Sequence, residues 1–258
     1  MDDRMRTNEI KRKLAAGQTV VGSFIYVPSA KLTEIVGLCG FDFVVIDMEH
    51  GPVDTVVAED MVRAAELTGV TPVLRVSHNS PHLILRALDI GAQGIHVPEV
   101  NTVEDARSAA ASMKYGPVGH RGLAGTRAAD YGLRQPLGEY AVAANQETMC
   151  IVHIESQQAV RNLDQLLQVP GIDIYYLGPE DISNSLGIPG QSRDPRVVSL
   201  VEDGIRQVVA AGKIAGCIAA DVPTARRYVE LGAQYIALMR SDSWRTDRGN
   251  FLTRFVHD

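Results

Sequence analysis

The sequence predicts an α/β fold, a closed (β/α)8 TIM barrel that spans residues 1–258 as a single domain. Eight short apolar runs alternate along the chain with segments of helical spacing. The runs are apolar on both faces, which is typical of parallel strands covered by helices. The chain length of 258 residues also fits one such barrel. An open doubly wound sheet is the rival, but it usually carries a Gly-rich phosphate turn after an early strand, and this sequence has none.

The predicted strands and helices follow one another in order. The strands are predicted at 19–26, 41–48, 71–76, 94–100, 149–155, 173–178, 214–220 and 235–240. The helices are predicted at 30–40, 54–69, 80–91, 102–113, 156–169, 194–212 and 222–233. Several helical segments begin at Ser, Asp or Thr and end at Gly, as helix caps prefer, and Thr102 with Asp105 has the form of a capping box. Residues 114–147 are predicted as a long irregular connection, a feature that is usually functional or interfacial.

Composition excludes several classes of partner. The chain has 31 acidic and 25 basic residues, a formal net charge of -6, and no Lys/Arg cluster, so nucleic acid and anionic membranes are not expected as partners. No apolar stretch approaches the length of a membrane span, and the charged N-terminus lacks a signal core. Cys39, Cys150 and Cys217 lie in apolar segments and are predicted as buried free thiols. These features predict a cytoplasmic protein.

Charged residues follow five of the predicted strands. The side chains at the carboxyl ends of barrel strands meet at one mouth, where TIM barrels place their active sites. Any one of these residues could be a solvated loop residue, but five strand ends with charged residues predict a shared site. The residues, in strand order, are Asp47, Glu49 and His50, then Arg75, Glu99, Glu155 and Asp181.

Glu155 and Asp181 form the best candidate for a metal pair. Two carboxylates with few other protein ligands suit Mg²⁺ or Mn²⁺, which keep water ligands and accept substrate oxygens. The nearby Gly178 and Pro179 would let backbone amides approach a bound anion. The structural alternative makes Asp181 the N-cap of a helix that starts at Ile182, and Glu155 an ordinary loop acid.

Arg75 and His50 are the candidates for charge stabilisation and proton transfer. A buried arginine needs an anion, and a planar guanidinium binds a carboxylate or enolate oxygen well. The alternative for Arg75 is a structural ion pair with Asp47 or Glu49. His50 is the natural proton-transfer group because an unperturbed imidazole titrates near neutral pH.

Two further histidines and the lysines complete the prediction for the site. His153 lies two residues before Glu155 and is predicted on the same face, where it could contact the substrate or even the metal. His96 lies within a strand and is predicted as a satisfied core histidine. None of the five lysines ends a predicted strand, which argues against a Schiff-base lysine and in favour of metal-assisted carbonyl chemistry.

Five motifs resemble those of the HpcH/HpaI aldolases, the metal-dependent class II pyruvate aldolases typified by 4-hydroxy-2-oxoheptanedioate aldolase. They are "FVVIDMEHGP", "PVLRV", "KYGPVGHRG", "HIES" and "YYLGPEDIS", in the family's order between about Val20 and about Tyr235. The resemblance implies a carbon–carbon lyase that cleaves or forms 4-hydroxy-2-oxo acids through a pyruvate enolate, giving pyruvate and an aldehyde. The alternatives are an oxaloacetate decarboxylase or related metal-enolate lyase on the same site, or a non-catalytic barrel that binds a small acid.

The resemblance also implies roles for individual residues. It makes Glu155 and Asp181 the ligands of Mg²⁺ or Mn²⁺, with Co²⁺ as a further candidate, His50 the general base and Arg75 the transition-state stabiliser. It makes Asp89 the aspartate that raises the basicity of the histidine, although the sequence itself places Asp89 at a helix end away from the mouth. Asp47 and Glu49 would support the site. The implied substrate contacts are Arg75, His153, Gly178, Pro179, Glu180 and Asp181.

The family is oligomeric and commonly hexameric, so a homo-oligomer is expected, with the tail at about 241–258 exchanged between subunits. Three residues depart from the family's pattern. His153 stands where glutamine is frequent, Glu180 where a small residue is usual, and Glu99 where the residue is often apolar or neutral. These departures bear on which substrates the site accepts more than on the type of reaction.

Overall fold

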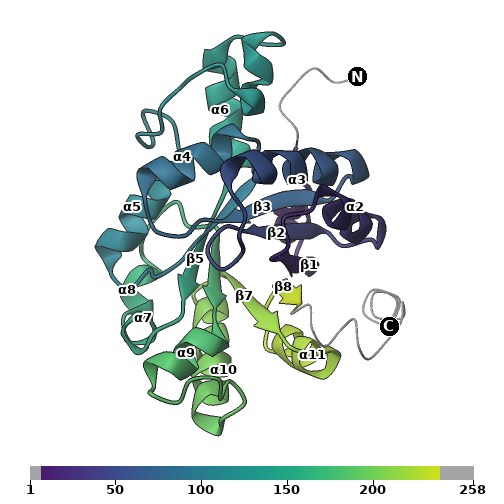
Figure 1. The fold of residues 1–258 in the computed structure, drawn as a ribbon. Helices are drawn as coiled ribbons and strands as arrows, with labels where there is room; N and C mark the ends of the chain where they lie inside the picture. Colours follow the sequence, from purple (N-terminus) through teal and green to yellow (C-terminus); the bar gives the residue numbers. More distant parts are fainter. Residues whose placement is uncertain (1–6, 239–258) are drawn as a thin grey trace.

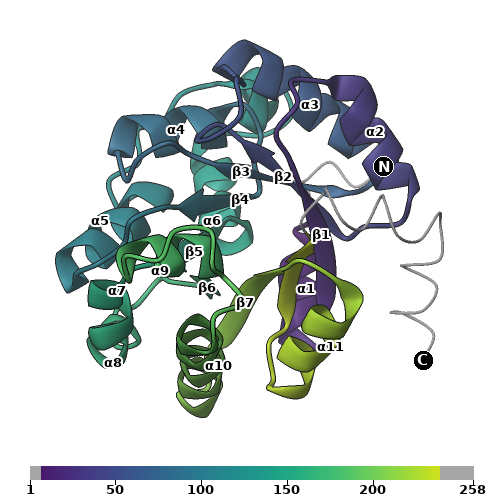
Figure 2. The ribbon, with the colours of Figure 1, turned by 60° about the horizontal axis from the view of Figure 1, so that its bottom comes forward.

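The computed structural model describes residues 7–238, which form a closed barrel of eight parallel strands with helices around it (Figure 1, Figure 2). Each strand pairs with its neighbours in sequence, and the last strand pairs with the first. The predicted fold class is therefore confirmed, and the fourth strand ends earlier than predicted. The strands are β1 (Val20–Ile25), β2 (Phe43–Asp47), β3 (Thr71–Arg75), β4 (Gly94–Val97), β5 (Met149–Ile154), β6 (Ile174–Leu177), β7 (Ile214–Ala219) and β8 (Tyr235–Leu238).

Most of the outer helices lie where the sequence predicts them. These are α2 (Ala30–Leu38), α3 (Thr55–Thr68), α4 (Pro81–Asp89), α5 (Val103–Met113), α10 (Pro195–Ala210) and α11 (Val222–Glu230). The capping box of Thr102 and Asp105 is present at the start of α5. The single helix predicted at 156–169 is wrong, because α7 (Gln157–Arg161) and α8 (Leu163–Leu166) are separated at Asn162. The side-chain amide of Asn162 donates a hydrogen bond to the carbonyl oxygen of Asn101 (2.8 Å), which fixes this break against the loop after β4.

Four elements were not predicted: α1 (Glu9–Ala15), the 3-10 helix η1 (Arg127–Gly132), α6 (Leu137–Glu147) and α9 (Pro179–Ser185). Two apolar side chains of α1, Ile10 and Leu14, pack into the interior of the barrel. The connection 114–147 is thus only partly irregular, because α6 occupies its last third and buries Tyr140 and Ala144, four residues apart. Elements with only one to three buried residues give too weak a periodicity to be read from sequence.

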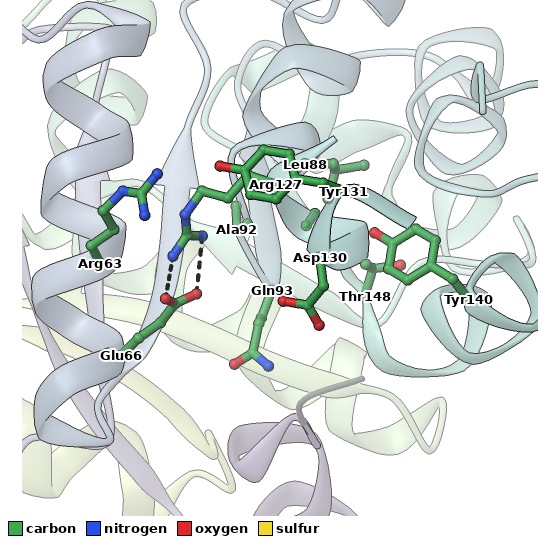
Figure 3. A pocket seen from close by; sticks show the side chains of 12 residues that line it. Arg63, Glu66, Leu88, Ala92, Gln93, Arg127, Asp130, Tyr131, Tyr140 and Thr148 are labelled. Carbon is green, nitrogen blue, oxygen red and sulfur yellow. Dashed lines mark hydrogen bonds and ion pairs between the residues drawn. The ribbon is translucent and has the colours of Figure 1, made fainter. Parts of the chain in front are cut away.

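Two arginines with largely buried side chains tie the connection 114–147 to the barrel. Arg127 Nη1 donates to Glu66 Oε1 (3.1 Å) and to the carbonyl oxygen of Ile90 (2.8 Å), and its Nη2 pairs with the other oxygen of Glu66 (Figure 3). Arg121 Nη2 pairs with Asp89 Oδ1 (2.8 Å). Arg127 and Glu66 border a cavity of about 190 Å³ that is also lined by residues just before β4 and β5. This cavity therefore lies at the end of the barrel where the strands begin.

Replacing Arg127 by methionine is expected to destabilise the protein by about 3 kcal/mol, because it removes the guanidinium that contacts both oxygens of the largely buried carboxylate of Glu66. The measurement is urea-induced unfolding. Arg63→Met is the matched control, since Arg63 borders the same cavity but is about half exposed and pairs with Glu59 on the surface. Its expected cost is below about 1 kcal/mol. Equal costs for the two variants would contradict the structural role given to Arg127.

The inside of the barrel is filled by aromatic and aliphatic side chains. Phe43 stacks on Tyr235 with ring centroids 4.0 Å apart, and a Cβ added to Gly22 would lie 2.2 Å from the Phe43 ring. Glycine at this position therefore makes room for a large ring in a narrow barrel. Cys150 and Cys217 are buried free thiols as predicted, whereas Cys39 is exposed at the C-cap of α2, contrary to the prediction. Within residues 7–238, no helix has the length and apolar character needed to cross a bilayer.

Candidate active site

The predicted site residues converge at the end of the barrel where the strands finish. A cavity of about 150 Å³ opens there, and most of the residues singled out in the sequence border it. Four bordering residues were missed: Phe24, Tyr26, Tyr176 and Ile218. Each stands an even number of residues from another inward-facing position, so strand alternation was the signal that could have found them. The lining residues are Phe24, Tyr26, His50, Arg75, His153, Glu155, Tyr176, Gly178, Glu180, Asp181 and Ile218.

Glu155, directly after β5, is held by hydrogen bonds to both carboxylate oxygens. His153 Nδ1 lies 2.8 Å from Oε2, and the backbone N–H of Glu99 donates to Oε1 at 2.7 Å. Glu155 is buried. Burial alone would raise the pKa of its carboxyl group, but the neighbouring His153 and the Glu99 amide outweigh burial and lower the pKa. The carboxylate is thus fixed in its ionised, acceptor-only form.

Glu99 contributes its main chain rather than its side chain. Its φ of 55° lies in the left-handed region, which non-glycine residues adopt at a cost of about 1 kcal/mol or more. This conformation, just after the end of β4, accompanies the amide contact to Glu155, while the Glu99 side chain is exposed. The sequence had suggested only an extra carboxylate near the mouth.

Asp181 lies in the first turn of α9, close to Glu155. The helix begins at Pro179 with Gly178 as its N-cap, so the alternative in which Asp181 caps a helix starting at Ile182 is wrong. A Cβ built on Gly178 would lie 3.3 Å from Glu155 Oε2 and 3.9 Å from Asp181 Oδ2. The two carboxylates therefore border the same small space. Partial desolvation, and then the charge of Glu155, raise the pKa of Asp181, so a cation between them would relieve the repulsion.

These two carboxylates fit a hard divalent cation. Within residues 7–238, no three His, Cys, Asp or Glu side chains are grouped to hold a metal, so water or substrate oxygens would complete the coordination, as Mg²⁺ and Mn²⁺ prefer. A metal contact by His153, which the sequence left open, would need a ring nitrogen that already has a partner here. Its Nδ1 faces Glu155 and its Nε2 lies 2.8 Å from His96 Nδ1, so neither nitrogen is left for a metal.

Replacing Gly178 by alanine is expected to weaken Mn²⁺ binding at least about tenfold. The added methyl group would stand 3.1 Å from Glu155 Cβ and crowd both carboxylates, while a φ of −106° makes the backbone conformation acceptable for alanine. Binding is measured by the loss of the free Mn²⁺ signal in electron paramagnetic resonance. Gly138→Ala is the control, because nothing lies within 4 Å of a Cβ there. Unchanged affinity in Gly178→Ala would contradict a metal site at this glycine.

Arg75, the last residue of β3, is held in place by two acidic residues at the end of the neighbouring strand β2. Its Nε and Nη2 donate to the two oxygens of Asp47 (2.9 and 2.5 Å), and Nη1 lies 3.2 Å from Glu49 Oε2. The ion pair considered as an alternative role for Arg75 is therefore present. These contacts use three of the five guanidinium N–H groups, and Arg75 also borders the cavity. A structural and a substrate-binding role are thus compatible.

Asp47 also shapes the loop that carries Glu49 and His50. Its Oδ1 accepts from the backbone N–H of Glu49 (3.0 Å) and of His50 (3.3 Å), and the residue is fully buried. The His50 side chain is 59% exposed, and its Nε2 stands 4.0 Å from Glu49 Oε2. Burial raises the pKa of Glu49, although Arg75 opposes the shift. His50, the predicted proton-transfer group, therefore lies at the rim of the cavity, on a loop whose backbone is held by the buried Asp47.

Asp89 and Lys114 lie at the opposite end of the barrel. Asp89 is the last residue of α4, which runs antiparallel to the strands, and it pairs with Arg121. Asp89 therefore does not contact His50 of the same chain, and the role that the resemblance gives to Asp89 stays a prediction. Lys114 is buried, and burial lowers its pKa to about 8, but its Nζ bonds the Thr148 carbonyl oxygen (2.7 Å) just before β5.

The fold and the mouth together define a (β/α)8-barrel enzyme with an acidic, arginine-flanked site. The model of the HpcH/HpaI aldolase/citrate lyase family matches residues 21–241. The chain is 39% identical over 232 residues to a pyruvate aldolase of Rhizobium etli, covering 90% of each chain. It is 35% identical over 231 residues to a 4-hydroxy-2-oxo-heptane-1,7-dioate aldolase of Salmonella paratyphi C, covering 90% of this chain and 88% of the relative.

Among solved structures, an HpcH/HpaI aldolase/citrate lyase family protein of Burkholderia cenocepacia superposes with a TM-score of 0.87 at 32% identity, covering 93% of this chain and 95% of that one. The chain belongs to the HpcH/HpaI aldolase/citrate lyase family. It is a carbon–carbon lyase of the aldolase type.

Proposed function

We propose that the chain is a divalent-metal-dependent pyruvate aldolase, which cleaves 4-hydroxy-2-oxo acids to pyruvate and an aldehyde and forms them in reverse. The observation that carries the proposal is the shared space beside Gly178, bordered by the carboxylates of Glu155 and Asp181. Arg75 and His50 border the same cavity, so a cation site, a fixed positive charge and a base lie together. Relatives named as pyruvate aldolase and 4-hydroxy-2-oxo-heptane-1,7-dioate aldolase support the same reaction class.

Each side chain has a role in cleavage. Glu155 and Asp181 would hold Mg²⁺ or Mn²⁺, which, when bound, supplies Lewis-acid stabilisation of negative charge on the 2-oxo acid. His50 Nε2 takes the proton of the C4 hydroxyl group as the C3–C4 bond breaks and the aldehyde leaves. The electron pair of that bond is delocalised onto the C2 oxygen as a pyruvate enolate, and Arg75 donates hydrogen bonds to the developing charge. Return of the proton to C3 gives pyruvate.

The test is release of pyruvate from a panel of 4-hydroxy-2-oxo acids, coupled to lactate dehydrogenase, before and after EDTA treatment. Turnover is expected to stop with EDTA and to return with Mg²⁺ or Mn²⁺. Oxaloacetate belongs in the panel, because its decarboxylation would use the same enolate. Full activity in EDTA, or activity on oxaloacetate alone, would contradict the proposal. The expected cytoplasmic location and homo-oligomeric assembly stay predictions, and the tail at about 241–258 lies outside the described residues.

A further inference from the structure

A chain of buried hydrogen bonds runs from Glu155 into the interior of the barrel. His153 Nδ1 lies 2.8 Å from Glu155 Oε2, and His153 Nε2 lies 2.8 Å from His96 Nδ1. His96 Nε2 in turn lies 2.9 Å from the hydroxyl oxygen of Tyr235, on β8. His96 and Tyr235 are fully buried, and His153 is 1% exposed. None of the catalytic steps above uses His96 or Tyr235.

The donors in this chain have a single consistent direction when both rings are neutral. A carboxylate only accepts hydrogen bonds, so the proton of His153 is on Nδ1 and its Nε2 is an acceptor. His96 must then donate from Nδ1, which makes its Nε2 an acceptor for the Tyr235 hydroxyl group. Burial, and then the charge of neighbouring groups, lower the pKa of His96 well below its ordinary value, which keeps that ring neutral.

Packing fixes the planes of the rings. Tyr176 stacks on His153 with ring centroids 4.9 Å apart and meets His96 edge-on at 4.8 Å. Phe24 contacts His96 edge-on at 5.6 Å, and Phe43 stacks on Tyr235 at 4.0 Å. Rings held on several sides cannot turn to exchange hydrogen-bond partners without repacking the interior.

We propose that Tyr235 and His96 are positioning residues, which act through His153 to fix the carboxylate of Glu155 for metal binding. The inference rests on the proposed function, because it takes Glu155 as a metal ligand. Partners that orient a ligating carboxylate typically change metal affinity by about 10–100-fold when they are removed. The chain of hydrogen bonds starts on β8, passes through β4 and reaches β5, so the position of Glu155 depends on two strands, β4 and β8, that carry no ligand themselves.

The first experiment compares two replacements of His153, using Mn²⁺ affinity measured by electron paramagnetic resonance. Glutamine offers an amide that donates to Glu155 and a carbonyl that accepts from His96, so His153→Gln is expected to keep affinity within about threefold. Leucine offers neither group, so His153→Leu is expected to lose about tenfold or more. Equal affinities for the two variants would overturn the proposal.

The second experiment tests the far end of the chain with a matched pair of tyrosines. Tyr235→Phe removes the hydroxyl group that donates to His96, whereas Tyr175→Phe removes a hydroxyl group that donates to the Leu166 carbonyl oxygen (3.0 Å) outside the barrel interior. Both side chains are fully buried, so both variants should lose similar thermal stability. Only Tyr235→Phe is expected to weaken Mn²⁺ binding, by about threefold or more. Identical Mn²⁺ affinities would overturn the proposal.

A third measurement needs no variant that alters folding. Histidine side-chain ¹⁵N NMR of the unaltered protein at neutral pH is expected to show His96 with its proton on Nδ1. A His96 protonated on Nε2 would overturn the stated direction of the hydrogen bonds.

Glu155→Gln separates this inference from the proposed function. If Glu155→Gln leaves Mn²⁺ affinity unchanged, the proposed function fails. If it abolishes binding while His153→Leu and Tyr235→Phe bind normally, only this inference fails.

Discussion

Replacing Glu155 by glutamine is expected to lower kcat about 10³-fold and to remove the response to added Mg²⁺ or Mn²⁺. Glutamine keeps the shape of the side chain and can still accept from the Glu99 amide, but it removes a negative charge beside Asp181. The site then loses both a ligand and the electrostatic attraction that would hold a divalent cation. Initial rates of pyruvate release across a metal titration measure the effect.

Glu99→Gln is the matched control for that experiment. It removes a carboxylate close to the same rim, yet the backbone N–H that holds Glu155 is unchanged. Its kcat and metal affinity are expected to stay within about threefold of the unaltered enzyme. If Glu155→Gln behaved like Glu99→Gln, the metal pair would have to be sought elsewhere.

Replacing Arg75 by methionine is expected to destabilise the protein by about 3–5 kcal/mol and to lower kcat about 10²-fold or more. The loss of stability follows because Asp47 is fully buried and would keep an uncompensated negative charge. The loss of turnover follows because the guanidinium no longer faces the charge that develops on the C2 oxygen. Urea unfolding and steady-state kinetics measure the two effects separately.

A double variant distinguishes the two roles of Arg75. In Asp47→Asn with Arg75→Met, no buried charge remains at position 47 and Oδ1 can still accept from the Glu49 and His50 amides, so much of the lost stability is expected to return. Activity is not expected to return, because the positive charge at the cavity is still missing. Recovery of turnover in the double variant would show that Arg75 is only a structural partner of Asp47.

Strand alternation and strand-end chemistry were readable from the sequence because both are local. Apolar runs such as 43–46 predict strands that are buried on both faces. In a (β/α)8 barrel, the residue that follows each such run lies at the mouth. Glu155, Asp181, Arg75 and His50 were all singled out on this basis, and the structure places them around one cavity. Their catalytic roles stay proposals.

Contacts between distant segments were not readable in the same way. The partner of Arg75 was left open between Asp47 and Glu49, and the structure shows both contacts. The left-handed backbone at Glu99, and the hydrogen bond that its N–H group donates to Glu155, depend on how β4 ends against β5. The bonding of His96 to His153 and Tyr235 likewise depends on barrel closure, which no local pattern encodes.

Glu155 is held by a hydrogen bond from the main chain of residue 99, and this has a consequence for how substrate specificity can change during evolution. Any residue other than proline brings an N–H to position 99, so the side chain there can be exchanged without loosening the carboxylate beneath it. Glycine would even relieve the unfavourable torsion. In the proposed reaction, a change in the size or charge of residue 99 is therefore expected to alter which aldehyde is accepted without moving the carboxylate of Glu155.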